Sequence, residues 1–338
     1  MTKILLIYTG GTIGMIKNPL TGELESFNFK HIHDHVPELS RLNVNIESIS
    51  FEEPIDSSEM NLTHWKMMAK LVEEHYAQYD GFVILHGSDT MAFSASALSF
   101  MLQGLKKPVV FTGSQLPIGT IRTDGKENLI TAIEIAGMRD ENGEAILQEV
   151  AVYFEYSLYR GNRSSKISAN QFEAFQSPNY PELAKAGIHI EWQKDRLFRS
   201  SLTQLTVFTE LQNKVALIRL YPGMNFEVYE SIFKDTRVKA IVLETYGSGN
   251  APSDMHFQRM VTAFIAKGGV VLNITQCGSG AVQQGIYQTS SFFERVGVIS
   301  GRNLTSEAAL TKLMYLLGST DETTIKESLQ VALVGEMD

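Results

Sequence analysis

Cysteine is nearly absent from this chain of 338 residues, which contains Cys277 and no other. A single thiol excludes an internal disulfide framework and is typical of a reducing compartment. Long apolar runs are also missing near the start. The first one, residues 4–8, is too short for a signal-peptide core and far shorter than the ~20 residues of a membrane helix. We therefore expect a cytoplasmic protein without a membrane partner.

Positive charge is in short supply. The chain has 29 lysines and arginines against 38 aspartates and glutamates, which gives a formal net charge of −9 and an isoelectric point near 5.5. This balance opposes contact with many phosphate groups, and no local basic patch offsets it. We expect no nucleic-acid partner and a small-molecule substrate instead.

Clusters of metal-binding residues are missing as well. His31, His33 and His35 alternate along one segment that also contains Asp34, and this spacing favours a solvated segment over a zinc site. Cys277 follows an apolar run, so we interpret it as a small buried residue and not as a nucleophile. The sequence predicts neither a metal nor a cofactor.

The chain does contain a regular alternation of short apolar runs and amphipathic stretches, which is typical of helices wound around mostly parallel sheets. Its length and its 43% hydrophobic content suffice for two cores. We predict two doubly wound α/β domains: residues 1–191, with the nucleophile and most catalytic residues, and 214–338, joined by a linker over 192–213. The predicted strands are 4–8, 81–86, 108–112, 150–156, 215–220, 240–245 and 270–275, and the clearest helices are 126–139, 254–267 and 305–317.

Polar side chains follow three of the predicted strands. Residues 9–14 (TGGTIG), 86–90 (HGSDT) and 159–166 (YRGNRSSK) come after the first, second and fourth strands. Because strand ends converge on one crevice in a doubly wound sheet, we expect a ligand site there. Thr12, on a turn rich in glycine, is the candidate nucleophile.

A threonine hydroxyl is a poor nucleophile at neutral pH unless a base removes its proton. Lysine serves as that base when desolvation lowers its pKa, so a hydroxyl between Lys166 and the reacting centre is a workable relay. Each motif also has a structural interpretation that stays open here. TGGT is compatible with a tight turn or a phosphate cradle, Ser88, Asp89 and Thr90 with a helix N-cap, and Lys166 with a solvated surface lysine.

Four motifs occur in a specific order: TGGTI at 9–13, DSSEMN at 56–61, HGSDTM at 86–91, and GNR at 161–163 followed by Lys166. Together they resemble the signatures of the bacterial-type L-asparaginase family, most closely those of its cytoplasmic type I branch. The resemblance extends over nearly the whole chain and includes YGSGNAP at 246–252 and TQC at 275–277.

This resemblance implies hydrolysis of L-asparagine to L-aspartate and ammonia through an acyl-enzyme formed on Thr12. It also implies that Ser88, Asp89 and Lys166 form a polar triad that activates the nucleophile or water. Family members assemble their sites between the protomers of a dimer or tetramer. They hold the α-carboxylate and α-ammonium of the substrate with residues that correspond to Asp56, Ser57, Ser58, Ser88 and Asp89.

Two features depart from the family pattern. Ser88 stands where most relatives have threonine, which keeps the hydroxyl but loses the methyl group that restricts its rotamer. The loop over 15–30 contains no tyrosine, although many relatives place one there, next to the nucleophile. The turn-forming residues of this loop favour a lid that closes over substrate. The sequence does not say whether Glu23, Glu25, Phe27 or Phe29 takes the tyrosine's role.

Two other functions stay open. The asparaginase-like subunit of a tRNA-dependent amidotransferase uses related motifs, but it carries an additional N-terminal domain, and the acidic charge here fits a tRNA partner poorly. A non-catalytic amino-acid sensor would account for the missing tyrosine and for Ser88. The sequence also leaves the choice between asparagine and glutamine open, because one methylene is worth only about 1–3 kcal/mol.

Overall fold

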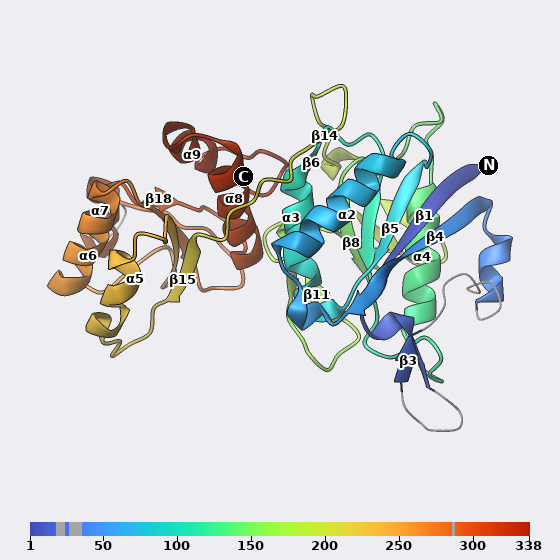
Figure 1. Ribbon diagram of the computed structural model, residues 1–338, viewed down its shortest axis with the longest axis horizontal. Helices are drawn as coiled ribbons and strands as arrows, with labels where there is room; N and C mark the ends of the chain where they lie inside the picture. Colours follow the sequence, from blue (N-terminus) through green and yellow to red (C-terminus); the bar gives the residue numbers. More distant parts are fainter. Residues whose placement is uncertain (18–23, 27–35, 286–287) are drawn as a thin grey trace. The chain divides into compact units, whose positions relative to one another are not determined.

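The structure, a computed structural model, describes residues 1–17, 24–26, 36–285 and 288–338. The chain divides into two compact units, Met1–Thr209 and Glu210–Asp338 (Figure 1). Each unit has a sheet with parallel strands and flanking helices, so the predicted α/β class with mostly parallel sheets is confirmed. Within the segment 192–213, strand β14 (Thr206–Val207) pairs with β6 (Leu102–Gln103) of the N-terminal unit.

The N-terminal unit is built on an eight-stranded sheet, as far as its residues are described. Strands β4, β1, β5, β7 and β8 lie side by side and are parallel to one another. Strands β9, β12 and β13 extend the sheet beyond β8, and each is antiparallel to the strand before it. The central strands are buried along their whole length, as expected when helices cover both faces. The strands are β1 Thr2–Gly10, β4 Val44–Ile55, β5 Gly81–Leu85, β7 Val109–Thr112, β8 Val150–Phe154, β9 Ser157–Arg160, β12 Ala184–Ala186 and β13 Ile190–Trp192.

Helices α2 (Leu62–His75), α3 (Met91–Met101) and α4 (Gly125–Gly137) flank this sheet (Figure 1). α4 packs against β1, β5, β7 and β8, whereas α3 packs against β7 and β8 and contacts α2. Ile4 and Leu6 share a core cluster with residues of α4. Because side chains alternate along a strand, the intervening residues of β1 point to the opposite face of the sheet.

The predicted strand over 150–156 ends early, and this corrects the expected path of the chain. β8 ends at Phe154, Glu155 and Tyr156 adopt positive φ of 43° and 69°, and β9 runs back antiparallel. Residues 159–166 therefore do not leave a parallel strand directly. They complete β9, pass along α3, and reach strand β10 (Ser165–Lys166), which pairs with β11 (Phe175–Gln176). The reversal escaped the sequence analysis because its turn has no glycine or asparagine, the usual residues at positive φ.

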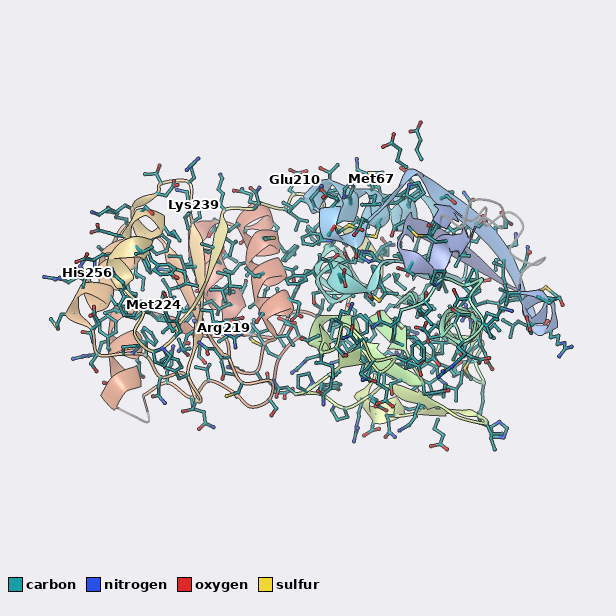
Figure 2. All side chains as sticks on the ribbon, turned by 90° about the horizontal axis from the view of Figure 1, so that it is seen from below. Met67, Glu210, Arg219, Met224, Lys239 and His256 are labelled. Carbon is teal, nitrogen blue, oxygen red and sulfur yellow. The ribbon has the colours of Figure 1, made fainter. Side chains whose placement is uncertain are left out.

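The C-terminal unit contains four parallel strands within its described residues, in the order β15, β16, β17, β18. α8 packs against β15, β16 and β17, whereas α6 packs against β17, α5 and α7. Figure 2 labels Arg219 at the end of β15 and His256 near the start of α6. The elements are β15 Val215–Arg219, β16 Ala240–Thr245, β17 Val270–Thr275, β18 Ile299–Ser300, α5 Glu230–Lys234, α6 Met255–Ala266, α7 Gln288–Val296, α8 Ser306–Ser319 and α9 Glu322–Leu329.

Cys277 lies beyond the end of β17 and is exposed. The expectation of a buried cysteine is therefore wrong, because the strand ends at Thr275 and the chain leaves the core there. No helix of the described part of the chain is long and apolar enough to cross a membrane, and no histidine, cysteine, aspartate or glutamate group in it is arranged to hold a metal ion. His31, His33, Asp34 and His35 lie outside the described residues.

Candidate active site

Thr12 lies on a turn that requires glycine. Gly10, the last residue of β1, and Gly11 have φ of 137° and 85°, and Thr12 begins a short 3-10 turn that ends at Gly14. A Cβ atom on Gly11 would come within 2.5 Å of the Gly87 Cα atom, and one on Gly10 within 2.0 Å of the Ile55 carbonyl oxygen. The turn that carries Thr12 is therefore packed directly against the residue before Ser88.

Two hydrogen bonds hold the backbone on either side of this turn in place. Thr9 Oγ1 donates to the Leu85 carbonyl at 2.9 Å, which ties the end of β1 to the end of β5. Tyr8 Oη donates to the Gly14 carbonyl at 3.3 Å, and burial raises the pKa of Tyr8 to about 12, so this phenol stays neutral. The side chain of Thr12 is partly exposed, and no hydrogen bond joins its hydroxyl to Ser88 among the contacts of the described residues.

Lys166 joins the second and third motifs. Its Nζ donates to Ser88 Oγ at 2.8 Å and to Asp89 Oδ1 at 2.6 Å. The Lys166 side chain is 15% exposed, whereas that of Asp89 is 68% exposed. Residues that are 78 positions apart thus meet beside the Thr12 turn. The predicted contact between Ser88 and Lys166 is present.

The structure supports neither a helix-cap role for Ser88, Asp89 and Thr90 nor a solvated Lys166. Ser88, Asp89 and Thr90 precede α3, but no side-chain hydrogen bond caps the start of that helix. Thr90 Oγ1 donates instead to the Ser57 carbonyl at 2.7 Å. Lys166 is not a solvated surface lysine, because its ammonium is largely enclosed and has two acceptors. The side chains of Thr90 and Lys166 therefore make contacts with residues far away in the sequence.

The loop over 56–58 reaches the same place from the end of β4. Ser57 is buried, and a Cβ atom on Gly87 would come within 2.6 Å of Ser57 Oγ. Asp56 and Ser58 are exposed, and Asp56 Oδ1 accepts the Ser58 backbone N–H at 2.8 Å. That N–H lowers the pKa of the Asp56 carboxyl, which keeps it ionised. The structure thus brings Ser57 against the Ser88 turn and leaves Asp56 and Ser58 open to solvent.

His86 was missed by the sequence analysis, and it holds the peptide that precedes Ser88. Its Nε2 lies 2.8 Å from Ser94 Oγ, and its Nδ1 lies 2.7 Å from the Gly87 carbonyl oxygen. Trp65 Nε1 donates to Ser94 Oγ at 2.9 Å, so the serine proton is left for Nε2 of the histidine. Nδ1 then carries the ring proton and donates to Gly87. Burial lowers the pKa of His86 to about 4, so the ring is neutral near pH 7.

Gln115 is a second residue that was missed. Ser88 Oγ donates to Gln115 Oε1 at 3.2 Å, and Gln115 Nε2 donates to the Gln171 carbonyl at 2.9 Å. The sequence contained a signal for it, because Gln115 follows the predicted strand over 108–112. The rule that pointed to Thr12 and Ser88, a polar residue just after a parallel strand, applies equally to this strand.

The candidates for the missing tyrosine cannot be placed in the same way. Glu23, Phe27 and Phe29 lie outside the described residues. Glu25 belongs to β3 (Leu24–Ser26), which pairs antiparallel with β2 (Met15–Lys17), and only its backbone is described.

Comparison with known proteins identifies the family. Residues 3–198 match the family model described as asparaginase, N-terminal, and residues 214–329 match the glutaminase/asparaginase C-terminal domain. The chain belongs to the asparaginase family. L-asparaginase 1 of Escherichia coli is 40% identical over 341 residues, a match that covers 99% of this chain and 98% of that protein. The crystal structure of L-asparaginase I from Vibrio cholerae is 38% identical with a TM-score of 0.90, and the match covers 100% of this chain and 99% of that one.

Another similar protein bears on the alternative functions. A glutamyl-tRNA(Gln) amidotransferase subunit of Archaeoglobus fulgidus is 32% identical, and the match covers 100% of this chain and 80% of that protein. The resemblance to asparaginases of the type I branch is confirmed by the full-length similarity to the Escherichia coli and Vibrio cholerae proteins.

Proposed function

We propose that this chain hydrolyses L-asparagine to L-aspartate and ammonia, with Thr12 as the nucleophile. Membership of the asparaginase family and the full-length similarity to L-asparaginases support the activity. One observation carries the assignment of the site. Lys166 Nζ contacts both Ser88 and Asp89, on the turn against which the Thr12 turn is packed.

The reaction has two balanced steps. Thr12 Oγ forms a bond to the side-chain amide carbon of asparagine, the C–N bond breaks, and the hydroxyl proton leaves with the nitrogen as ammonia. Water then attacks the acyl-threonine ester, which releases aspartate and returns a proton to Thr12 Oγ. Ser88 and Lys166, 2.8 Å apart, carry protons in these steps. Backbone N–H groups of the glycine turn stabilise the oxyanion, a contribution of about 2.7–4 kcal/mol per donor in other enzymes.

Substrate binding falls to Asp89, Ser88 and the loop over 56–58. The Asp89 carboxylate remains 68% exposed although one of its oxygens accepts from Lys166, so it can also receive the α-ammonium of asparagine. Ser57 and Ser58 offer hydroxyls to the α-carboxylate. The ionised Asp56 fixes the loop, because its carboxylate accepts the Ser58 N–H.

Replacement of Thr12 tests the nucleophile. We expect Thr12→Ala to lower ammonia release from asparagine by at least about 1,000-fold, because the variant lacks the hydroxyl that forms the acyl-enzyme. The assay is coupled to glutamate dehydrogenase and is run beside Thr206→Ala, which removes an exposed hydroxyl from β14. Undiminished turnover in Thr12→Ala would refute the assignment.

The same assay separates the alternative functions. Tight calorimetric binding of asparagine without ammonia release would identify an amino-acid sensor. Ammonia release that requires a copurifying partner protein would identify an amidotransferase component, a role supported by the 32% identity to the Archaeoglobus fulgidus amidotransferase subunit.

The proposal also includes the assembly and the location of the protein. The resemblance to the type I branch supports a homo-oligomer, a dimer or a tetramer, and the C-terminal domain over 214–338 contributes to this oligomer and to completion of the site. The single cysteine supports a cytoplasmic location. Light scattering coupled to size-exclusion chromatography measures the number of protomers.

A further inference from the structure

One side-chain amide connects Ser88 with the loop that follows Lys166. Gln115 Oε1 accepts the Ser88 hydroxyl at 3.2 Å, and Gln115 Nε2 donates to the Gln171 carbonyl at 2.9 Å. Gln171 lies in the connection between β10 and β11, and β10 carries Lys166. The amide therefore spans the gap between the two segments that supply the serine and the lysine.

The backbone of Gln115 is itself held firmly. Both carboxylate oxygens of Asp124 accept its N–H, at 3.1 and 2.8 Å, and Oδ1 also accepts the Leu116 N–H at 3.1 Å. Asn128 Nδ2 donates to the Gly113 carbonyl at 3.0 Å and to Asp124 Oδ2 at 3.3 Å. Asp124 is 5% exposed and Asn128 is 1% exposed, at the start of α4. These hydrogen bonds fix the backbone of the turn after β7, and with it the position from which the Gln115 side chain extends.

Ser88 needs such an external constraint. A serine lacks the second Cβ substituent that limits χ1 in threonine, so its hydroxyl populates several rotamers unless a partner selects one. In this structure Ser88 Oγ accepts from Lys166 and donates to Gln115. These two contacts together select the rotamer in which Oγ stays within reach of the lysine.

We propose that Gln115 is a positioning residue that fixes the Ser88 rotamer and couples it to the 167–174 loop through Gln171. This inference rests on the proposed function, because it assigns Gln115 a part in the relay formed by Ser88 and Lys166. Gln115 takes over the constraint that a threonine methyl would supply. It touches neither substrate nor the reacting atoms in this role, and acts through Ser88.

Three variants test the proposal by steady-state ammonia release over a range of pH. Gln115→Leu removes both hydrogen bonds, and we expect kcat to fall roughly tenfold while KM changes less than about threefold. Gln115→Glu keeps an acceptor for Ser88 and adds a negative charge near Lys166. Because a negative charge favours the protonated form of a nearby general base, the ascending limb of the kcat profile moves to higher pH. Gln171→Ala is the matched control, because its backbone carbonyl remains, and it should behave as wild type.

A rescue experiment separates positioning from a merely structural role. Ser88→Thr introduced into Gln115→Leu restores the missing rotamer constraint, and we expect it to recover most of kcat. Circular-dichroism melting confirms that each variant is folded, and Gln115→Glu, which is nearly isosteric, is the variant that keeps the test decisive if Gln115→Leu fails to fold.

The failures of the two proposals are distinguishable. A wild-type protein that releases no ammonia overturns the proposed function. An active wild type whose Gln115 variants keep its kcat and pH profile overturns the role of Gln115. The role of Gln115 is also overturned if Gln115→Leu and Gln115→Glu lose kcat equally, the pH profile does not move, and Ser88→Thr does not restore kcat.

Discussion

Lys166 is held by two acceptors of different character. Ser88 Oγ is a neutral partner at 2.8 Å, whereas the Asp89 carboxylate is 68% exposed to water. Because solvent screens such an ion pair, it contributes only about 0–1 kcal/mol to folding. The ion pair of this lysine therefore contributes little to the stability of the fold.

Lys166→Met separates these two contributions. We expect the chemical step to slow by roughly 100-fold or more, because the proton relay loses its terminal group. The free energy of unfolding should change by less than about 1 kcal/mol. Single-turnover acylation and urea denaturation measure the two quantities, and Lys185→Met, at an exposed position of β12, is the control. Normal single-turnover rates in Lys166→Met would rule out the relay.

His86 links the site to the pH dependence of stability. Burial lowers its pKa from 6.5 to about 4, so between these values the unfolded chain binds a proton that the folded chain does not. The stability contributed by the neutral ring is complete above pH 6.5 and is lost as the pH falls toward 4. The loss amounts to about 3 kcal/mol.

Urea denaturation between pH 7.5 and 4.5 checks this expectation. In His86→Gln the decline of the unfolding free energy with falling pH should be shallower than in wild type. His189→Gln, which removes an exposed imidazole, should keep the wild-type slope. Parallel curves for wild type and His86→Gln would show that the His86 ring is not kept neutral by burial.

Among the elements, the turn after β1 combines a backbone requirement with a packing requirement. Gly11 has φ of 85°, and a Cβ atom there would come within 2.5 Å of Gly87. Gly143 has φ of 78° and open space around the same position. The pair therefore separates the cost of the dihedral angle from the cost of the clash.

Gly143→Ala should cost about 1–2 kcal/mol of unfolding free energy, because alanine is strained at positive φ. Gly11→Ala should cost at least about 2 kcal/mol more and should abolish ammonia release, since the Thr12 and Ser88 turns must move apart. Urea denaturation and the ammonia assay measure both effects. If the two variants lose stability equally, the two turns are not packed as tightly as described.

The elements that sequence analysis placed well are those whose signals are local. The strand predicted over 270–275 and the helix predicted over 254–267 correspond to β17 (Val270–Thr275) and α6 (Met255–Ala266). Their bounds follow from apolar periodicity, from Asp254, which caps α6, and from glycines after the helix. The reversal after Phe154 has no such local marker, since Glu155 and Tyr156 take up positive φ only because the sheet continues with β9.

The site was predictable only in part, for the same reason. Family motifs identified Thr12, Ser88 and Lys166 because each of these residues lies in or next to a short sequence motif. Gln115 and Ser88 are 27 positions apart, and their contact depends on the rotamers of both side chains. No local sequence pattern indicates such a contact. The buried hydrogen bonds of His86 could not be predicted for the same reason.

At the scale of the whole chain, the last residues are anchored by a buried ion pair. Lys312 on α8 and Glu336 both have 0% side-chain exposure, with Nζ and Oε1 2.7 Å apart. Lys312 Nζ also donates to the Val331 carbonyl at 2.6 Å, and the Glu336 carboxylate accepts the backbone N–H groups of Leu333 and Val334. Burial lowers the pKa of Lys312, and the nearby Glu336 opposes that shift.

Lys312→Met leaves the Glu336 carboxylate buried without its cation. We expect a loss of about 3–5 kcal/mol of unfolding free energy. The double variant Lys312→Met/Glu336→Gln removes the charge but keeps acceptors for the backbone, and should recover at least about half of that loss. Lys326→Met, at an exposed position of α9, should stay within about 0.5 kcal/mol of wild type in the same urea experiment. If the double variant recovers none of the lost unfolding free energy, the unpaired charge of Glu336 is not the cause of the loss.

The reversal between β8 and β9 has a kinetic consequence. Ala151 pairs with Arg160 in this hairpin, whereas Ile4 of β1 must find Gly81 of β5 and Thr2 must find Val44 of β4. A short loop closes at a much smaller entropic cost than these long crossovers. During refolding, pulse-labelled amide hydrogens of the hairpin should become protected before those of β1, so the strand that precedes the Thr12 turn docks later than the hairpin.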